Sequence, residues 1–214
     1  MEKLDCRIIE VGSLNEEIRI VALGCLHFGA AGCDERLIDF WIDYVMRRPN
    51  TNAVLLGDLV DGIYEKDKRY LQDEVADWCY DKKWGGTLID RQYHYLEHKF
   101  RKVADAGRLL WIHAGNHEWS LKRYASRDLT LDWSRALKVP YAGYSCHSNL
   151  IVRATKGASA RTRPRTYRVT FYTTHGAGAA QTDGAIMNRV AGMLNDYDAD
   201  VCLMAHLHRR MHIL

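Results

Sequence analysis

Gly115-Asn116-His117-Glu118 follows the apolar run Leu109-Leu110-Trp111-Ile112, and the rest of the chain is organised around this stretch. In it, an Asn whose carbonyl oxygen can bind a metal is followed by a titratable imidazole and then by a carboxylate. A strand that ends in a polar turn gives a four-residue match of this kind by chance. The stretch therefore indicates a functional site only together with the motifs around it.

Four further runs of strand length end in residues that bind metals. They are Gly24-Cys25-Leu26-His27 after residues 18–23, Gly57-Asp58-Leu59-Val60-Asp61 after 53–56, Thr173-Thr174-His175-Gly176 after 167–172, and Ala205-His206-Leu207-His208 after 201–204. In open α/β sheets, ligands bind at the carboxyl ends of the strands, so the five strand ends are expected to deliver their polar residues to one place. The spacing predicts a shared site.

Taken in order, the five motifs resemble those of the calcineurin-like metallophosphoesterase superfamily, and the resemblance covers about residues 18–208. The family order is Asp-x-His, Gly-Asp-x-x-Asp, Gly-Asn-His-Asp/Glu, His and Gly-His-x-His. Cys25 stands where the family has Asp, and Ala205 stands where it has Gly. The His-Gly-x-Gly run at 175–178 and the helix expected after it also look like those of stand-alone phosphoesterases of bacteriophages.

The resemblance implies an α/β fold in which two mixed β-sheets pack as a sandwich with helices on both outer faces. It also implies two divalent metal ions (Mn, Zn or Fe) bridged by Asp58. The first ion would be held by Cys25, His27, Asp58 and His208, and the second by Asp58, Asn116, His175 and His206. His117 would stabilise the phosphate or protonate the leaving oxygen, with Glu118 setting its tautomer and Asp61 fixing a ligand histidine.

By the same resemblance, the function is metal-dependent phosphoester hydrolysis through a metal-bridging hydroxide. The favoured substrate is a phosphodiester in nucleic acid or a nucleotide. The alternatives are a phosphomonoesterase or nucleotide-sugar pyrophosphatase, and, in another class, a metal-binding module that has lost turnover through the change at Cys25.

Composition limits the broad class of protein. The 214 residues are 47% hydrophobic and 27% charged, which is typical of one soluble domain, here residues 1–214. No apolar run is long enough to span a membrane, and the acidic N-terminal residues do not resemble a secretory signal, so a cytoplasmic location is expected. The six cysteines form no Cys-x-x-Cys pair, and a net charge of +3 does not by itself indicate nucleic acid.

Apolar spacing predicts helices from Asp34 to about Arg47, over 87–106, over 127–138 and over 183–197. Strands are predicted at 4–11 and 18–23 around a turn at Gly12, and a helical insertion at 62–86. The aromatic residues of the insertion either attach it to the domain or form a wall on which a substrate stacks. His94 and His98 lie off the apolar stripe of their helix and are predicted to be surface residues, whereas His113 is predicted to be a hydrogen-bonded strand residue.

Three questions stay open at this stage. The basic run Arg153, Lys156, Arg161, Arg163, Arg165 and Arg168 is either a solvated hairpin or an arm that contacts the phosphates of nucleic acid. Cys25 is either a metal ligand or a small residue packed at a strand end. The family normally has further strands after its last motif, so the sequence printed here is expected to lack them. An exposed sheet edge would then allow an oligomer to form.

Overall fold

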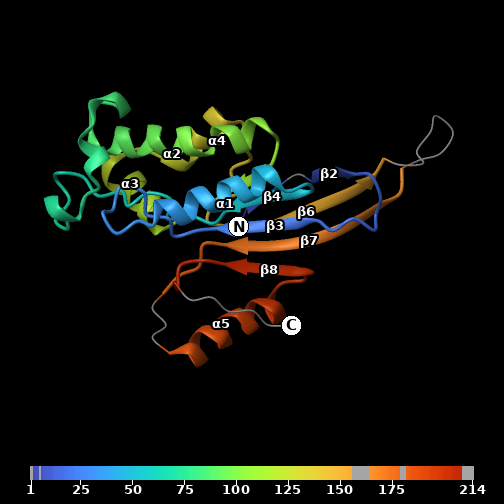
Figure 1. The fold of residues 1–214 in the computed structure, drawn as a ribbon. Helices are drawn as coiled ribbons and strands as arrows, with labels where there is room; N and C mark the ends of the chain where they lie inside the picture. Colours follow the sequence, from blue (N-terminus) through green and yellow to red (C-terminus); the bar gives the residue numbers. More distant parts are fainter. Residues whose placement is uncertain (1, 5, 156–163, 179–181, 209–214) are drawn as a thin grey trace.

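The computed structural model describes residues 2–4, 6–155, 164–178 and 182–208, which form an α/β fold of two β-sheets with α-helices around them (Figure 1). The elements in chain order are β1 (Glu2–Lys3), β2 (Arg7–Val11), β3 (Arg19–Leu23), α1 (Glu35–Arg47), β4 (Thr51–Leu55), the short 3-10 helices η1 (Gln72–Glu74), η2 (Asp77–Tyr80) and η3 (Lys82–Trp84), α2 (Leu88–Asp105), β5 (Leu109–Ile112), α3 (Asn116–Ala125), α4 (Leu129–Leu137), β6 (Ser145–Ala154), β7 (Thr166–Thr174), α5 (Asp183–Asp196) and β8 (Val201–Met204).

The smaller sheet has the order β3-β4-β5, and its strands are parallel. The β3-α1-β4 segment is a βαβ unit, and α1 lies in the range that the apolar spacing predicts. Helix α1 begins where expected, because the Asp34 carboxylate accepts a hydrogen bond from the backbone N–H of Leu37 at 3.0 Å. Parallel strands point their carboxyl ends to the same edge, so the loops after β3, β4 and β5 lie side by side.

The larger sheet has the order β1-β6-β7-β8, and β2 also pairs with β6. It is mixed: β6 and β7 are antiparallel, whereas β2 pairs with β6 and β8 pairs with β7 in parallel. The two strands predicted around Gly12 both form, but β2 belongs to this sheet and β3 to the smaller one. The residues between them carry the chain from one sheet to the other.

The two sheets pack face to face, as the resemblance implies. The side chains of Val54 and Leu56 join the apolar cluster between the sheets, together with Leu150 and Phe171 of the larger sheet. Leu55 points the other way, into the cluster under the helices. This alternation follows from the two-residue period of a strand, and it explains why β4 is buried along its whole length.

Helices cover both outer faces of the sandwich (Figure 1). Helices α1, α2 and α4 lie on the smaller sheet, with Ile42, Phe100 and Trp133 buried beneath them. Helix α5 lies beside β8 on the other side, where its residue Met193 is buried. No helix in the described part of the chain is both long and apolar enough to cross a membrane.

The segment 62–86 contains three short 3-10 helices where we expected a helical insertion. Its own small core consists of Val75 and Cys79 against Leu88, which is too few apolar positions to support a longer helix. Trp78 stacks on Tyr95 of α2 with ring centroids 3.8 Å apart, and its indole N–H donates to Glu35 of α1. These contacts attach the segment to the domain.

The basic run is only partly described. Arg153 lies in β6 and pairs with Glu10 of β2 at 3.4 Å. Lys156, Arg161 and Arg163 lie outside the described residues. The hypothesis of a phosphate-contacting arm therefore stays a prediction.

Candidate metal centre

Backbone geometry sets the candidate site apart from the rest of the fold. Five of the predicted ligands and bridging residues have a left-handed backbone conformation, with φ between 49° and 71°, namely Cys25, His27, Asp58, His206 and His208. Non-glycine residues seldom adopt this conformation, and it is concentrated at functional sites. Strands β3, β4 and β8 are thus followed by sharp turns that direct polar side chains toward the same region.

Asp58, Asn116 and His175 bring three oxygen and nitrogen atoms together. The Nε2 atom of His175 lies 3.0 Å from Oδ1 of Asn116 and 3.1 Å from Oδ2 of Asp58. Its Nδ1 lies 2.7 Å from the carbonyl oxygen of Leu56, so Nδ1 carries a hydrogen and donates it there. In the neutral imidazole, Nε2 carries no hydrogen and is itself an acceptor, and it faces two other acceptors, Oδ1 of Asn116 and Oδ2 of Asp58. Such an arrangement needs a proton or a cation between the three atoms.

The charges of this cluster are coupled. Burial alone would raise the pKa of Asp58, but the hydrogen bond and charge of His175 and the N–H of His117 hold it below its usual value. Burial alone would lower the pKa of His175, but Asp58 and the Leu56 carbonyl raise it. A cation bound between these atoms would therefore take the place of a proton on His175.

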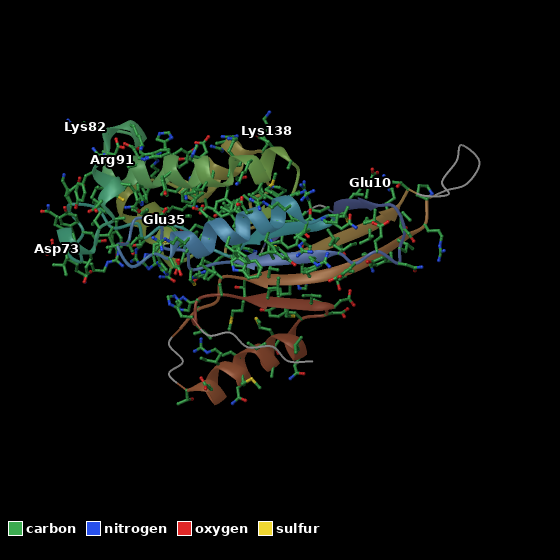
Figure 2. All side chains as sticks on the ribbon, in the orientation of Figure 1. Glu10, Glu35, Asp73, Lys82, Arg91 and Lys138 are labelled. Carbon is green, nitrogen blue, oxygen red and sulfur yellow. The ribbon has the colours of Figure 1, made fainter. Side chains whose placement is uncertain are left out.

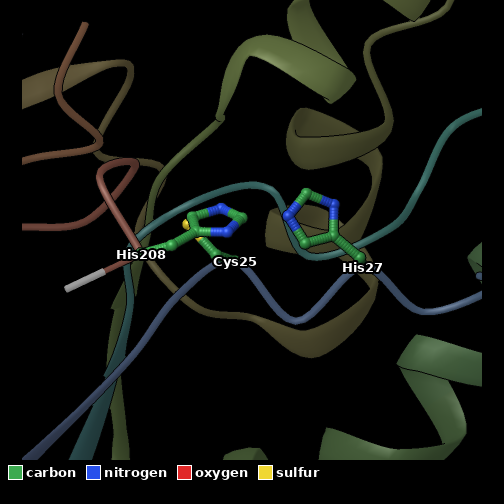
Figure 3. Close-up of side chains that lie close together, drawn as sticks. All are labelled: Cys25, His27 and His208. Carbon is green, nitrogen blue, oxygen red and sulfur yellow. The ribbon is translucent and has the colours of Figure 1, made fainter. Parts of the chain in front are cut away.

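Cys25, His27 and His208 form a second group of ligand atoms, which all lie within 4.8 Å of one another (Figure 3). Cys25 also belongs to such a group with Asp58 and His175, and His27 to one with Asp58 and His117. The groups overlap, so the two predicted ligand sets meet at Asp58. The Nε2 atom of His27 is buried and has no hydrogen-bond partner among the described residues.

His206 lies at the margin of these groups. Its ring centroid is 5.1 Å from that of His175, and its Nε2 lies 3.2 Å from the carbonyl oxygen of Gly178. The backbone N–H of His206 donates to Sγ of Cys25 at 3.2 Å. This bond joins the end of β8 to the end of β3, so it connects the two sheets at the site.

The Cys25 thiol is held in its protonated form. Burial raises its pKa to about 11, and the carboxylates of Asp58 and Glu118 act in the same direction, whereas the His206 N–H opposes them. A metal that binds here has to displace this proton, and a coordinating thiol is deprotonated outright.

His117 is fixed by the loop after β4. Its Nδ1 makes a short contact with the carbonyl oxygen of Asp61 and lies 3.9 Å from the Asp61 carboxylate. A carbonyl only accepts, so Nδ1 carries the hydrogen and Nε2 is the free nitrogen. The ring meets that of His27 edge to face, with centroids 4.7 Å apart.

Glu118 does not have the role that we expected. Its carboxylate is buried and accepts hydrogen bonds from four backbone N–H groups, those of Asp58, Leu59, Val60 and Gly115, at 2.7–3.1 Å. Glu118 is the third residue of α3, and in that position its side chain caps the helix and points back toward the loop after β4. The Asp61 carbonyl, and not Glu118, contacts the His117 imidazole.

Two glycines allow the loops after β4 and β5 to touch. A Cβ atom on Gly57 would lie 2.5 Å from the backbone nitrogen of Gly115, and one on Gly115 would lie 2.2 Å from Asp58. Contacts under 3.0 Å with backbone atoms require the chain to move. The glycines of the two motifs therefore place Asp58 beside Asn116.

Three further histidines in the described part of the chain, His94, His98 and His113, lie outside the site. His113 is fully buried between the carbonyl of Gly143, 3.1 Å from Nδ1, and the hydroxyl of Thr173, 2.8 Å from Nε2. Both of its nitrogens are satisfied, as predicted. His94 and His98 are exposed on α2, which confirms the surface prediction.

Two positioning residues were missed at the sequence level. Gln92 of α2 is buried, and its amide bonds to the backbone of Gly62 and Ile63, directly after Asp61. Tyr144 donates from its hydroxyl to the carbonyl of Gly176 and packs its ring on His175. Neither residue carries a motif. Gln92 could have been predicted from its position, because it is a polar residue within one helical turn of the apolar stripe of α2.

The residues fit a pair of divalent cations. Within the part of the chain that the structure describes, His27 offers a buried nitrogen without a partner, and the atoms of Asp58, Asn116 and His175 converge without a donor between them in the neutral tautomer. Imidazole, carboxylate, amide oxygen and thiolate are the ligands that zinc, iron and manganese use in proteins. The Leu56 carbonyl orients His175 as outer-shell carbonyls orient metal-binding histidines.

Comparison with known proteins agrees with this geometry. The family model described as calcineurin-like phosphoesterase matches residues 18–210. No curated protein and no solved structure matches the chain.

Proposed function

The chain belongs to the calcineurin-like phosphoesterase family and is a metal-dependent phosphoesterase, and on that premise we propose that it is a phosphodiesterase acting on nucleic acid or nucleotides. The observation that carries the proposal is the convergence of Asp58, Asn116 and His175 within 3.1 Å at the end of the buried strands.

We assign the first cation to Cys25, His27, Asp58 and His208, and the second to Asp58, Asn116, His175 and His206. When bound, a pair of divalent ions polarises a phosphoryl oxygen and lowers the pKa of a water molecule. Asp58 belongs to both sets, because its carboxylate lies beside His175 and in the group of His27. Its negative charge would keep two cations close to one another.

His117 is assigned to the leaving group. The Asp61 carbonyl holds the Nδ1–H, so Nε2 is the atom free to face the substrate. When protonated, Nε2 donates a hydrogen bond or a proton to an oxygen in front of it. A positioned acid of this kind contributes a factor on the order of 10²–10⁴ to the rate.

The test compares bis(p-nitrophenyl) phosphate with p-nitrophenyl phosphate, with Mn²⁺ added. We expect the diester to be hydrolysed faster. The Asp58→Asn variant should lose both bound metal and rate, since the cations lose their shared carboxylate. The His117→Ala variant should keep its metal and lose rate by a factor on the order of 10² or more.

The other outcomes identify the other functions. A faster rate on the monoester would make the protein a phosphomonoesterase. Metal binding without turnover of either substrate would make it a metal-binding module. An Asp58→Asn variant with full metal and parental turnover would show that the site assignment is wrong, and metal loss in His117→Ala would make His117 a ligand.

A further inference from the structure

An open pocket lies next to the metal centre, between the loop after β4 and helix α3. It has a volume of about 600 Å³, and we name it the lateral pocket. Its walls are lined by residues that include Tyr64, Lys66, Lys68, Arg69, Ser120 and Tyr124. The assigned metal ligands and His117 are not among its lining residues, so the pocket adds a second place for a ligand beside the reacting phosphate.

Helix α3 connects the lateral pocket to the reaction site. Asn116, Ser120 and Tyr124 are four residues apart and so lie on one face of α3, each about 6 Å further along the axis. On the opposite wall, Gly62 lines the pocket and directly follows Asp61, whose carbonyl holds His117. A group bound in the pocket would therefore be the part of the substrate that is covalently attached to the reacting phosphate beside His117.

The charge of the pocket is positive. Arg69 forms a two-point ion pair with Asp67, with Nε–Oδ1 at 3.0 Å and Nη2–Oδ2 at 2.7 Å, so these two charges cancel and the loop is braced. Lys66 and Lys68 are exposed, and in the described part of the chain no carboxylate lies within 4.0 Å of either ammonium group. The lining of the pocket thus has three cationic side chains, Lys66, Lys68 and Arg69, against the one carboxylate of Asp67.

Aromatic rings complete the pocket. Tyr124 is 69% exposed on α3, and Tyr64 is half-buried against the domain core. Trp78 and Trp84 of the same segment are different, since both pack on Tyr95. Of the aromatic side chains in segment 62–86, Tyr64 is the one that lines this pocket. Aromatic rings beside lysines are typical of sites that bind single-stranded nucleic acid, because the bases stack on the rings and the phosphates bind the ammonium groups.

We propose that the lateral pocket is a subsite for the nucleotide next to the scissile phosphodiester, and that the substrate is a single strand of nucleic acid. Lys66 and Lys68 bind the adjacent phosphate, and Tyr124 stacks on its base. This inference rests on the proposed phosphodiesterase function and names its substrate class. A small diester such as bis(p-nitrophenyl) phosphate reaches the metal centre without using the pocket.

The experiment compares two substrates and two variants of the whole chain with Mn²⁺. The substrates are bis(p-nitrophenyl) phosphate and a short oligothymidylate, and the variants are Lys66→Ala/Lys68→Ala and Tyr124→Ala. For each variant we expect kcat/KM on the oligothymidylate to fall about tenfold, a typical loss for one stacked base or its phosphate contacts. The rate on bis(p-nitrophenyl) phosphate should not change.

Binding is measured separately from turnover, by fluorescence anisotropy of a labelled oligothymidylate on a His117→Ala background. The double lysine variant should bind more weakly, and the slope of log affinity against log salt should become shallower by about 1.4. That value is expected when two contacts to single-strand phosphates are lost. Tyr124→Ala should weaken binding and leave the slope as it was.

Matched controls use the same residue types outside the pocket. Lys82 and Lys138 are exposed near opposite ends of the helical layer of α2 and α4 (Figure 2). We combine Lys82→Ala with Lys138→Asn, because Lys138 has a φ of 55° that Asn tolerates. Trp119→Ala removes a 49% exposed ring from α3 that does not line the pocket. Neither control should change kcat/KM, affinity or salt slope.

Three results would overturn the proposal. The first is an unchanged affinity for the oligothymidylate in both pocket variants. The second is an equal loss of kcat/KM on the oligothymidylate and on bis(p-nitrophenyl) phosphate. The third is a loss of kcat/KM or affinity in the control variants equal to that in the pocket variants. A parent protein that cleaves bis(p-nitrophenyl) phosphate but does not bind the oligothymidylate refutes the subsite alone. A parent that cleaves neither diester refutes the phosphodiesterase function, and the binding measurement still decides whether the pocket holds nucleic acid.

Discussion

His113 shows how a single buried residue makes stability depend on pH. Burial lowers its pKa to about 4, partly opposed by the Gly143 carbonyl. An unfolded chain binds a proton at about pH 6.5, whereas the folded chain resists it until about pH 4. Between these values the unfolded state binds more protons, so stability falls as the pH falls.

We expect His113 to remove about 3 kcal/mol of stability between pH 6.5 and pH 4, at about 1.4 kcal/mol for each unit of pKa shift. Replacing it with Gln keeps a hydrogen-bonding amide and removes the titration. Urea unfolding at several pH values should give a shallower fall for His113→Gln than for the parent. His27 contributes a similar slope in both proteins, so parallel curves would show that His113 does not titrate as described.

Cys25 decides which metal the first site prefers. It lies in a group of ligand atoms with His27 and His208, and thiolate is softer than the Asp of the family. We expect protein purified without added metal to contain more zinc or iron than the Cys25→Asp variant, and the Asp variant to shift toward activity supported by manganese. Cys25→Ala should lose one metal. If Cys25→Ala binds two metals as tightly as the parent, Cys25 only packs at the end of β3.

At the residue level, the sequence predicted which side chains lie together at the candidate metal centre. It did not predict the role of Glu118. Cys25, His27, Asp58, Asn116, His117 and His175 were named from their motifs, and the structure brings them together. The order of letters in Gly-Asn-His-Glu placed Glu118 beside His117 in the chain. The side chain of Glu118 turns away, because residues one apart on a helix do not face one another.

Among the elements, the contact between the loops after β4 and β5 matters most for the site. Gly57 has a φ of 85°, and its missing Cβ leaves room for the backbone of Gly115. We expect Gly57→Ala to lower the free energy of unfolding by about 2 kcal/mol or more, which for a chain of this length is about 4–8 °C in Tm. Metal content should fall as well, since Asp58 would move away from Asn116.

Gly107→Ala is the control for this prediction. Gly107 also has a left-handed φ, of 67°, but a Cβ there would meet nothing within 4 Å. It therefore reports the cost of the backbone conformation without a clash. Equal Tm values and equal metal content in the two alanine variants would mean that the loops after β4 and β5 have space to separate.

The helices α1, α2, α4 and α5 could be predicted because each has a repeated apolar stripe or a side-chain cap, such as Asp34 for α1. Helix α3 could not. It begins at Asn116, within the motif itself, and its exposed residues Trp119 and Tyr124 break the expected pattern. Its stability comes from the buried Glu118 and from Leu121, which are tertiary contacts.

For the whole molecule, the predicted sandwich of two sheets is confirmed. The order of the motifs made this prediction possible. Five of the strands, β3, β4, β5, β7 and β8, are followed by a ligand-type residue, so the resemblance indicated where these five strand ends meet. The place of β2 in the larger sheet was not predictable, because β2 pairs with β6, which lies far away in the sequence. Register between segments far apart in sequence leaves no local signal.

Ligand-type residues come from both sheets, so the metals should stabilise the whole fold. Cys25, His27, Asp58 and Asn116 follow strands of the smaller sheet, and His175, His206 and His208 follow strands of the larger one. A ligand at one hundred times its Kd stabilises a protein by about 2.7 kcal/mol, which corresponds to about 5–10 °C here. Removing metal with EDTA should lower Tm by this amount, whereas Asp58→Asn should respond little. An identical Tm with and without EDTA would contradict metal binding across the two sheets.

The hydrogen bond from His206 to Cys25 joins residues 181 positions apart, and this distance has a consequence in time. A ribosome adds about 5–20 residues each second, so Cys25 exists for roughly ten seconds or more before His206 is made. During that interval the thiol belongs to an incomplete sheet. Neither assigned ligand set is complete before the end of β8 is made, and until then the growing chain depends on the packing and the strand pairing of its earlier elements.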